Sequence, residues 1–316
     1  MNSNTGSDAN LVSKTPIYNN VRFFKIFTAL SALALSLSGG FAFAFDFDIS
    51  SMYLGTSPLT YIFYAIIILT VAALALFSII SSKGCIYPNT YRAGTWLGAY
   101  AAVDLISFLV IISKDFIISP VAGATSTSEA VLAVSKGLLI IAVCLVTMIY
   151  FTGYFKKALI TNTVLGVFAV LWCTVIIAMT YLDNGVAINS PYELICQFGL
   201  AFAMLFIICE LRFSLGSEKY GMYKFTGGVT FCLNLLACVA SMILAAKGLY
   251  ELPLYSLPAS AMTIYSAKIF FARKSPLNSA SDSDKEFSII ESSDIYEDSS
   301  IPDNFEERTP TDENTN

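Results

Sequence analysis

Residues 58–80 read PLTYIFYAIIILTVAALALFSII, which is 23 residues without a charged side chain. A helix rises about 1.5 Å per residue, so about 20 apolar residues cross the roughly 30 Å hydrocarbon layer of a membrane. Seven more stretches are mostly apolar, with polar residues scattered singly, of which 96–113 is shorter and 254–272 more polar: 23–45, 96–113, 131–153, 159–181, 193–214, 226–246 and 254–272. Because a helix satisfies its own backbone in lipid, the sequence predicts an all-α, polytopic membrane bundle of about eight transmembrane helices.

The composition excludes several classes of protein. Of the 316 residues, 56% are hydrophobic and 13% are charged, against roughly 25% charged in a soluble domain. This argues against a disordered chain, a nucleic-acid binder and an ordinary soluble enzyme. Histidine, the usual general base and commonest metal ligand, is missing, and no Walker A, GxGxxG, HExxH or GxSxG motif occurs. The seven cysteines are odd in number and lie mostly in apolar runs, so we interpret them as buried apolar residues. We expect neither catalysis nor a cofactor or metal.

The orientation follows from lysine and arginine, which gather on the cytoplasmic side of membrane proteins. The N-terminus, every second loop and the start of the C-terminal segment carry eleven of them: Lys14, Arg22, Lys83, Arg92, Lys156, Lys157, Arg212, Lys219, Lys224, Arg273 and Lys274. The opposite side has Lys114 and Lys247. The pattern predicts an integral protein of the plasma membrane with both termini in the cytoplasm. One alternative is that residues 39–44 (GGFAFA) end a cleaved signal peptide, which would leave seven spans.

Four segments are predicted along the chain. Residues 1–22 form a cytoplasmic N-terminal segment, 23–153 and 154–272 form two four-helix units, and 273–316 form a disordered tail with 12 acidic and 4 basic residues. The pattern F-S-[IL]-x-S-x-K at 77–83 and again at 213–219 suggests that the two units are a tandem repeat. The alternative is that membrane-flanking segments share such residues for interfacial reasons alone.

Six polar residues within the predicted spans are candidates for function or packing. A charge at mid-bilayer costs about 2.5–3.5 kcal/mol, so such residues usually line cavities or form pairs. We expect two pairs that could form a substrate or ion pathway, Asp104 with Lys136 and Glu210 with Lys268. The alternative is a packing hydrogen bond for Asp104, and for the other three an interfacial position. Gln197 and Asn234 are interpreted as helix-packing amides. The tyrosines near span ends and Trp96 are interpreted as interfacial belts.

Two functions compete on this evidence. A transporter or permease for a small solute or ion would use the buried polar residues and the repeat. A non-catalytic membrane sensor or assembly protein would explain the tail, whose acidic and apolar islands could dock a cytoplasmic protein. The lipid bilayer is the one certain partner in either case, and no nucleic-acid partner is expected. A membrane-embedded enzyme is the weakest alternative, because histidine and catalytic motifs are missing.

Overall fold

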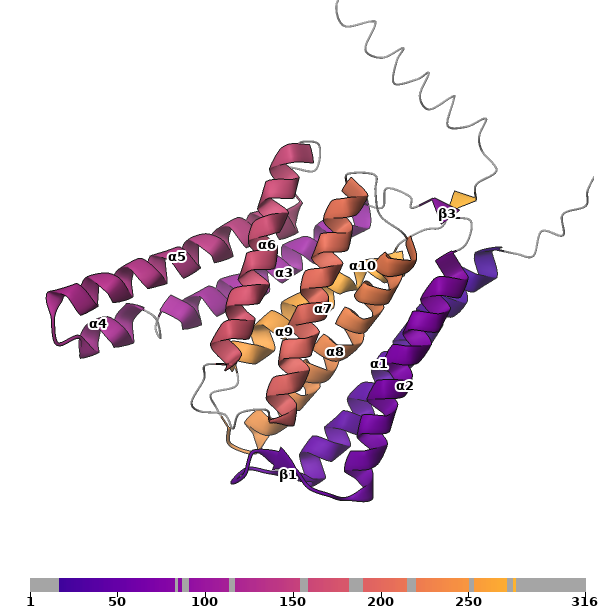
Figure 1. The fold of residues 1–316 in the computed structure, drawn as a ribbon, viewed down its shortest axis with the longest axis horizontal. Helices are drawn as coiled ribbons and strands as arrows, with labels where there is room; N and C mark the ends of the chain where they lie inside the picture. Colours follow the sequence, from indigo (N-terminus) through magenta and orange to yellow (C-terminus); the bar gives the residue numbers. More distant parts are fainter. Residues whose placement is uncertain are drawn as a thin grey trace, which may run out of the picture. The chain divides into compact units, whose positions relative to one another are not determined.

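The computed structural model describes residues 17–82, 85–86, 91–113, 117–153, 159–181, 190–214, 220–249, 253–271 and 275–276. This part of the chain is almost wholly helical (Figure 1). Its helices are α1 (Ile17–Phe45), α2 (Pro58–Ser82), α3 (Tyr91–Ser113), α4 (Ser119–Gly123), α5 (Thr127–Thr152), α6 (Leu159–Tyr181), α7 (Pro191–Ser214), α8 (Tyr220–Ala246), α9 (Pro253–Ser266) and α10 (Lys268–Phe271). Four two-residue strands accompany them: β1 (Phe47–Asp48), β2 (Tyr53–Leu54), β3 (Cys85–Ile86) and β4 (Ser275–Pro276). The predicted tail lies outside these ranges apart from 275–276, as does the first part of the N-terminal segment.

The helices support a multi-pass membrane protein. Every predicted stretch lies on a helix, and six helices of the described part are long and apolar enough to cross a membrane: α1, α2, α5, α6, α7 and α8. The third stretch contributes only the shorter apolar segment Trp96–Val110 of α3. The eighth is divided, because α9 ends at Ser266 and α10 begins at Lys268. The structure thus supports an all-α membrane bundle, and the count of eight spans stays a prediction.

Local signals set several helix ends. Ser126 caps α5 by accepting a hydrogen bond from the backbone N–H of Glu129 at 3.3 Å, while the Glu129 carboxylate accepts from the N–H of Thr125 at 3.0 Å. This serine and glutamate, three residues apart, resemble a capping box, although the glutamate reaches the residue before the cap. The same helix ends at Gly153, whose φ of 64° lies in the left-handed region that glycine tolerates. Ser190 starts α7 in a similar way, because its hydroxyl accepts from the N–H of Glu193 at 3.2 Å.

Helix α8 lies at the centre of the helix packing. It packs against α7 and α9, and the chain of contacts continues from α7 to α6, α5, α3 and back to α9, so that these six helices close a ring. Helices α1 and α2 pack together on a further side of α8 (Figure 1). All ten helices belong to one compact unit, residues 1–275. The two predicted four-helix units are therefore interleaved in space, and their origin by duplication stays a prediction.

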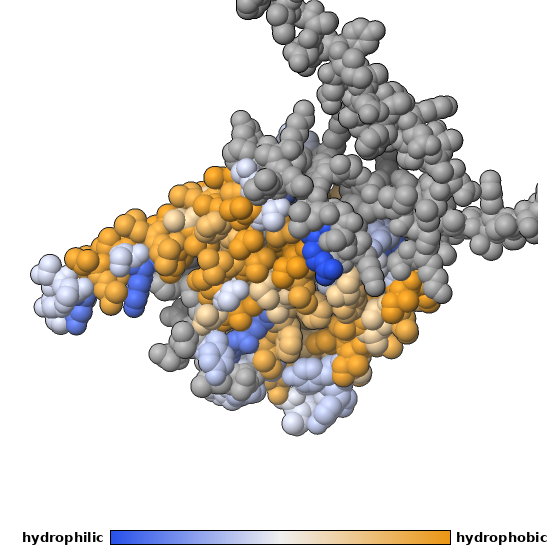
Figure 2. Space-filling view, turned by 45° about the horizontal axis from the view of Figure 1, so that its top comes forward, coloured by the Kyte–Doolittle hydropathy of each residue, from blue (hydrophilic) through white to orange (hydrophobic). Residues whose placement is uncertain are grey.

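Apolar residues make up most of the coloured surface in Figure 2. Large apolar residues of the outer helices are more than half exposed, including Ile68, Leu69 and Leu139. In water such a surface would be costly, at roughly 25 cal/mol per Å² of apolar area. Facing lipid it costs little, which agrees with the span assignment. Figure 1 also shows α5 reaching out from the other helices with α4 near its tip.

The two ends of the bundle differ in structure. At one end, β1 and β2 form an antiparallel hairpin between α1 and α2, and the Lys247 ammonium at the end of α8 donates to the carbonyl of Phe47 at 3.2 Å. We call this the hairpin end. At the other end, the Ser78 hydroxyl of α2 donates to the carbonyl of Gly221, near the start of α8, at 2.9 Å. Helices α5 and α7 also end there, as does α9, so side chains from their last turns can meet.

Candidate functional site

The strongest polar feature in the described part is an ion pair between α7 and α10. The Lys268 ammonium lies 3.0 Å from Oε2 and 3.2 Å from Oε1 of Glu210. Each side chain is only 17% exposed. The pair lies in the last turn but one of α7, at the end of the bundle away from the hairpin. The structure therefore brings together two of the four charged residues singled out in the sequence.

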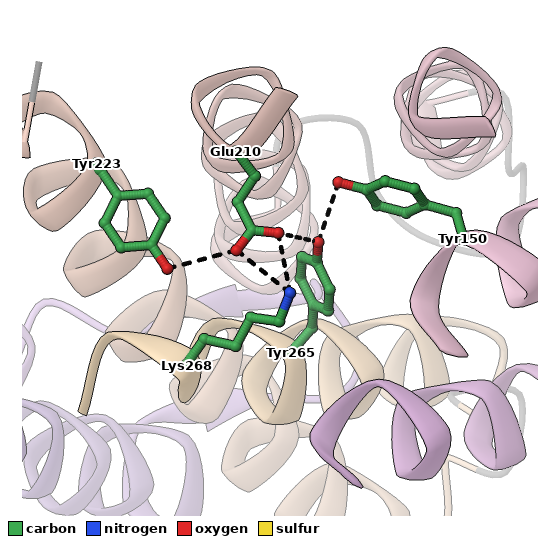
Figure 3. A network of polar contacts seen from close by, with 5 residues as sticks. All are labelled: Tyr150, Glu210, Tyr223, Tyr265 and Lys268. Carbon is green, nitrogen blue, oxygen red and sulfur yellow. Dashed lines mark hydrogen bonds and ion pairs between the residues drawn. The ribbon is translucent and has the colours of Figure 1, made fainter. Parts of the chain in front are cut away.

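Three tyrosines surround this carboxylate (Figure 3). The Tyr265 hydroxyl of α9 donates to Oε2 of Glu210, and the Tyr223 hydroxyl of α8 donates to Oε1 at 3.4 Å. The Tyr150 hydroxyl of α5 lies 3.1 Å from that of Tyr265. A phenol has one proton, and that of Tyr265 points to the carboxylate, so we assign Tyr150 as the donor between the two hydroxyls. The network joins five helices: α5, α7, α8, α9 and α10.

Helix geometry explains how these residues meet. Tyr265 and Lys268 are three positions apart, so they lie on one face of the chain as it passes from α9 to α10. Glu210 lies near the end of α7 and Tyr223 near the start of α8, and these two helices pack against each other, so the two residues can lie at the same depth. Tyr150 comes two residues before the end of α5. Each residue thus reaches the network from the last or first turns of its own helix.

The helix that carries Tyr265 and Lys268 is broken between them. Ala267 separates α9 from α10, and its N–H donates to the carbonyl of Thr263 at 3.1 Å. The N–H of Phe270 then donates to the carbonyl of Ala267 at 3.0 Å, which is the tighter three-residue spacing of a 3₁₀ turn. Broken helices are common at the binding sites of membrane transporters. Here the break directly precedes the lysine of the ion pair.

Aromatic rings form the walls of the network. The Tyr265 ring lies 4.6 Å from that of Phe151 and 5.9 Å from that of Phe206, measured between centroids. Phe206 also lies 5.0 Å from Tyr223. The Lys268 ammonium lies 4.2 Å from the centroid of the Tyr265 ring, a distance at which the π face attracts a cation. The polar atoms are therefore enclosed by apolar surfaces, which strengthens their electrostatic interactions.

A second polar contact lies deeper in the bundle. Asp104, half-buried near the middle of α3, accepts a hydrogen bond from the Ser260 hydroxyl of α9 at 2.6 Å. One turn further along α9, the Thr263 hydroxyl lies 4.0 Å from the sulfur of Cys238 on α8. Pro258 lies buried within α9 just before Ser260, and it has no N–H to donate to the preceding turn.

The remaining sequence candidates lie apart from these contacts. Lys136 is exposed on the outer part of α5, and among the described residues no ion pair joins it to Asp104. Asn234 is fully buried on α8, and its amide donates to the carbonyl of Gly199 on α7 at 2.9 Å. Gln197 donates to the Glu193 carboxylate at 2.7 Å, within α7 itself.

Sequence reasoning missed the three tyrosines of the network. The belt interpretation is wrong for Tyr150, Tyr223 and Tyr265, which are 6%, 0% and 2% exposed. In contrast, Trp96 is 84% exposed, as expected of an interfacial or lipid-facing residue. A tyrosine near a span end looks the same in sequence whether it faces the interface or the interior. The two positions are distinguished only by charged residues on neighbouring helices. Which residues are neighbours depends on the tertiary structure.

The network has no sign of a metal centre. Across the residues that the structure describes, no group of three or more Cys, Asp or Glu side chains is placed to hold a metal ion. No disulfide joins Cys144, Cys173, Cys196, Cys209, Cys232 and Cys238, which are buried except for the half-buried Cys238. No family model, curated protein or solved structure matches this chain. The chemistry of the site therefore follows from its own residues.

Proposed function

We propose that this chain is a transporter or permease for a small solute or ion, with a pathway built on α9 and α10. The observation that carries the proposal is the Glu210–Lys268 ion pair inside a bundle whose outer helices expose large apolar residues. Charged residues within membrane bundles are costly, and they commonly mark substrate or ion pathways.

The proposed pathway runs between two polar sites on one helix. Ser260 contacts Asp104, and Lys268, eight residues later, contacts Glu210. Eight helical residues correspond to about 12 Å, or roughly 40% of the hydrocarbon thickness. The Thr263 hydroxyl lies between the two. This supports a route from the middle of the bundle to the end away from the hairpin.

The proposed orientation places that end in the cytoplasm. The sequence carries its excess of lysine and arginine in the loops on this side, and both termini belong to it. We propose the plasma membrane as the location. The Glu210–Lys268 pair would then form the cytoplasmic site of the pathway, and Asp104 with Ser260 the central one. The Lys136 side chain is exposed on α5. It therefore belongs to the proposed pathway only if a movement of α5 brings it towards the other residues.

The test is solute flux in reconstituted vesicles. The full chain in liposomes is offered labelled inorganic cations, carboxylates, amines, amino acids and sugars, with protein-free liposomes as the blank. We expect at least one class to enter faster through the wild type, and Glu210→Gln and Asp104→Asn to alter that rate. The matched control is Glu129→Gln, which changes an exposed carboxylate at the start of α5.

The competing function is a non-catalytic sensor or assembly protein. One observation favours it: the Glu210 carboxylate already receives donors from Lys268, Tyr265 and Tyr223, as a purely structural tie between helices would require. If no offered solute crosses faster than in protein-free liposomes, while the variants merely melt at lower temperature, the transporter proposal is contradicted and this alternative is favoured.

A further inference from the structure

The groups around Glu210 have a chemistry of their own. Lys268, Tyr265 and Tyr223 all direct donors at one carboxylate, and Tyr150 lies behind Tyr265. An ammonium and several hydroxyls converging on one point are what a protein uses to bind a carboxylate. In the structure that position is taken by a side chain of the protein itself. The site is therefore a carboxylate-binding site with a tethered carboxylate in it.

We infer that Glu210 is a built-in competitor for a small organic carboxylate, and that protonation of Glu210 transfers Lys268 and the tyrosine hydroxyls to that substrate. This inference rests on the proposed transport function and names its substrate class and its coupling ion. A proton added to Glu210 makes a neutral acid and leaves the Lys268 ammonium without a counter-charge. The substrate carboxylate then supplies that charge, so one proton and one anion enter together and the site gains no net charge.

The surroundings of Glu210 favour a proton over a metal cation as the coupling ion. The charged and titratable groups that the described helices bring to this region are Lys268, Tyr265, Tyr223 and Tyr150. Helix α7 itself adds Cys209 and the exposed Arg212, and the start of α8 adds the buried Tyr220 and Lys224. The ammonium of Lys268 occupies the position that a metal ion would need at the carboxylate, and it would repel one. A proton can bind there without displacing the lysine from the bundle.

The walls of the site set the size and character of the substrate. Phe151 and Phe206 pack against the tyrosines of the network, Phe151 on the ring of Tyr265 and Phe206 on the rings of Tyr265 and Tyr223. These are apolar surfaces, so the part of the substrate behind its carboxylate should be small and apolar or aromatic. The group to be replaced is the carboxyl end of one glutamate side chain, which favours a monocarboxylate over a larger polyanion.

Binding is tested apart from transport, so that the two proposals can fail separately. The probes are benzoate and L-lactate, with benzamide and lactamide as uncharged matches, added to the purified full chain in detergent. The shift of its melting temperature with probe concentration gives an apparent Kd. For wild type we expect carboxylate affinity to rise at least tenfold from pH 7.5 to pH 5, with no response to the amides.

Two variants separate the roles of the ion pair. Glu210→Gln imitates the protonated acid, so it should bind benzoate at pH 7.5 as well as the wild type does at pH 5, with a flat pH profile. Lys268→Gln removes the ammonium and should weaken binding tenfold or more at every pH, since hydrogen bonds to charged groups are the stronger ones. Glu129→Gln and Lys247→Gln are the matched controls, and both should keep the wild-type profile.

Several outcomes would overturn the inference. Carboxylate binding that is unchanged in Lys268→Gln, or that keeps its full pH dependence in Glu210→Gln, contradicts it. If either chain does not fold, Tyr265→Phe keeps the ring and removes one donor, and it should weaken benzoate binding about threefold to tenfold. Flux of amines or inorganic cations without carboxylate binding leaves the transporter proposal intact and removes this one. Carboxylate binding without flux of any solute contradicts the transporter proposal and the coupling of proton and substrate, and leaves only the proton-dependent carboxylate site.

Discussion

Replacing Lys268 by methionine is expected to destabilise the fold by about 2–3 kcal/mol. The change keeps an unbranched side chain but leaves the Glu210 carboxylate in the bundle without its counter-charge. Removing one partner of a fully buried ion pair costs about 3–5 kcal/mol. Here 17% of each side chain is exposed, and Tyr265 and Tyr223 still donate to the carboxylate, so the cost falls below that range. Replacing both partners, as Glu210→Leu with Lys268→Met, removes both charges and should recover more than half of the loss.

The assay can use the protein's own cysteines. Cys144, Cys173, Cys196, Cys209 and Cys232 are buried thiols outside any disulfide, so a thiol-reactive fluorogenic dye labels them as the chain unfolds. At roughly 2–4 °C per kcal/mol for a protein of this size, Lys268→Met should lower the melting temperature by roughly 4–12 °C. The matched control, Lys247→Met at the hairpin end, should lower it less, because it removes one ammonium–carbonyl bond and strands no charge.

The double-mutant cycle tests whether Glu210 and Lys268 interact energetically or are merely adjacent. If the loss in the double variant equals the sum of the losses in Glu210→Leu and Lys268→Met, the two side chains do not interact energetically. That result, or a Lys268→Met chain that melts with the wild type, would refute the reasoning that the bundle depends on charge pairing at this site. A double variant closer to wild type than either single variant would establish the pair.

Three further predictions concern packing and the hairpin end. A Cβ at Gly98 would lie 1.5 Å from the carbonyl oxygen of Phe151, so Gly98→Ala must push α3 from α5 and should cost about 3 kcal/mol in dye melts, while Gly123→Ala, with nothing within 4 Å, should be neutral. Asn234→Ala removes the amide bond from α8 to α7 and should cost about 1 kcal/mol by the same measurement. The hydroxyl and backbone N–H of Ser50, with the hydroxyl of Ser51, lower the pKa of Asp48 from 3.8, so its stabilising effect is present above that pH and lost as the pH falls through the lowered value. Asp48→Asn should therefore melt below wild type at pH 7, and the gap should narrow as the pH falls below 3.8; a gap that widens in acid would contradict this.

The helices could be predicted from the sequence because their signals are local. An uncharged run such as 58–80 needs no knowledge of the rest of the chain, and the structure has α2 at Pro58–Ser82. Ser126 and Glu129 likewise mark the start of α5 through a contact within one turn. The two weakest predicted spans also have local causes. The third stretch contains Asp104, and the eighth contains the irregularity at Ala267. These are the two stretches that do not give long apolar helices over the described residues.

The arrangement of the helices could not be predicted in the same way. No sequence pattern indicates that α3 packs against α9, or that α1 and α2 pack against α8 rather than α3. The partner of Asp104 illustrates the difficulty: it is Ser260, a neutral residue 156 positions away. A charged residue is conspicuous within an apolar stretch of sequence, whereas a serine is not. Charge therefore pointed to Glu210 and Lys268, while the hydroxyls that complete both polar sites were missed.

The two polar sites act on the same helix, and this limits how the bundle can move. Helix α9 is tied to α3 by the Ser260–Asp104 bond, and the chain just beyond its end is tied to α7 by the Lys268–Glu210 pair. Loss of the Lys268–Glu210 pair frees only the end of α9 and α10 from α7. These segments could then move while the Ser260–Asp104 bond keeps the middle of α9 against α3. Pro258 and Ala267 interrupt regular helix on either side of this segment, which lowers the cost of such bending. Ser260→Ala cuts the other tie, so it should loosen α9 from α3 without changing the charge of either site. A change in the pH dependence of carboxylate binding in that variant would mean that the two sites are coupled through α9, whereas an unchanged profile would mean that Glu210 and Lys268 work alone.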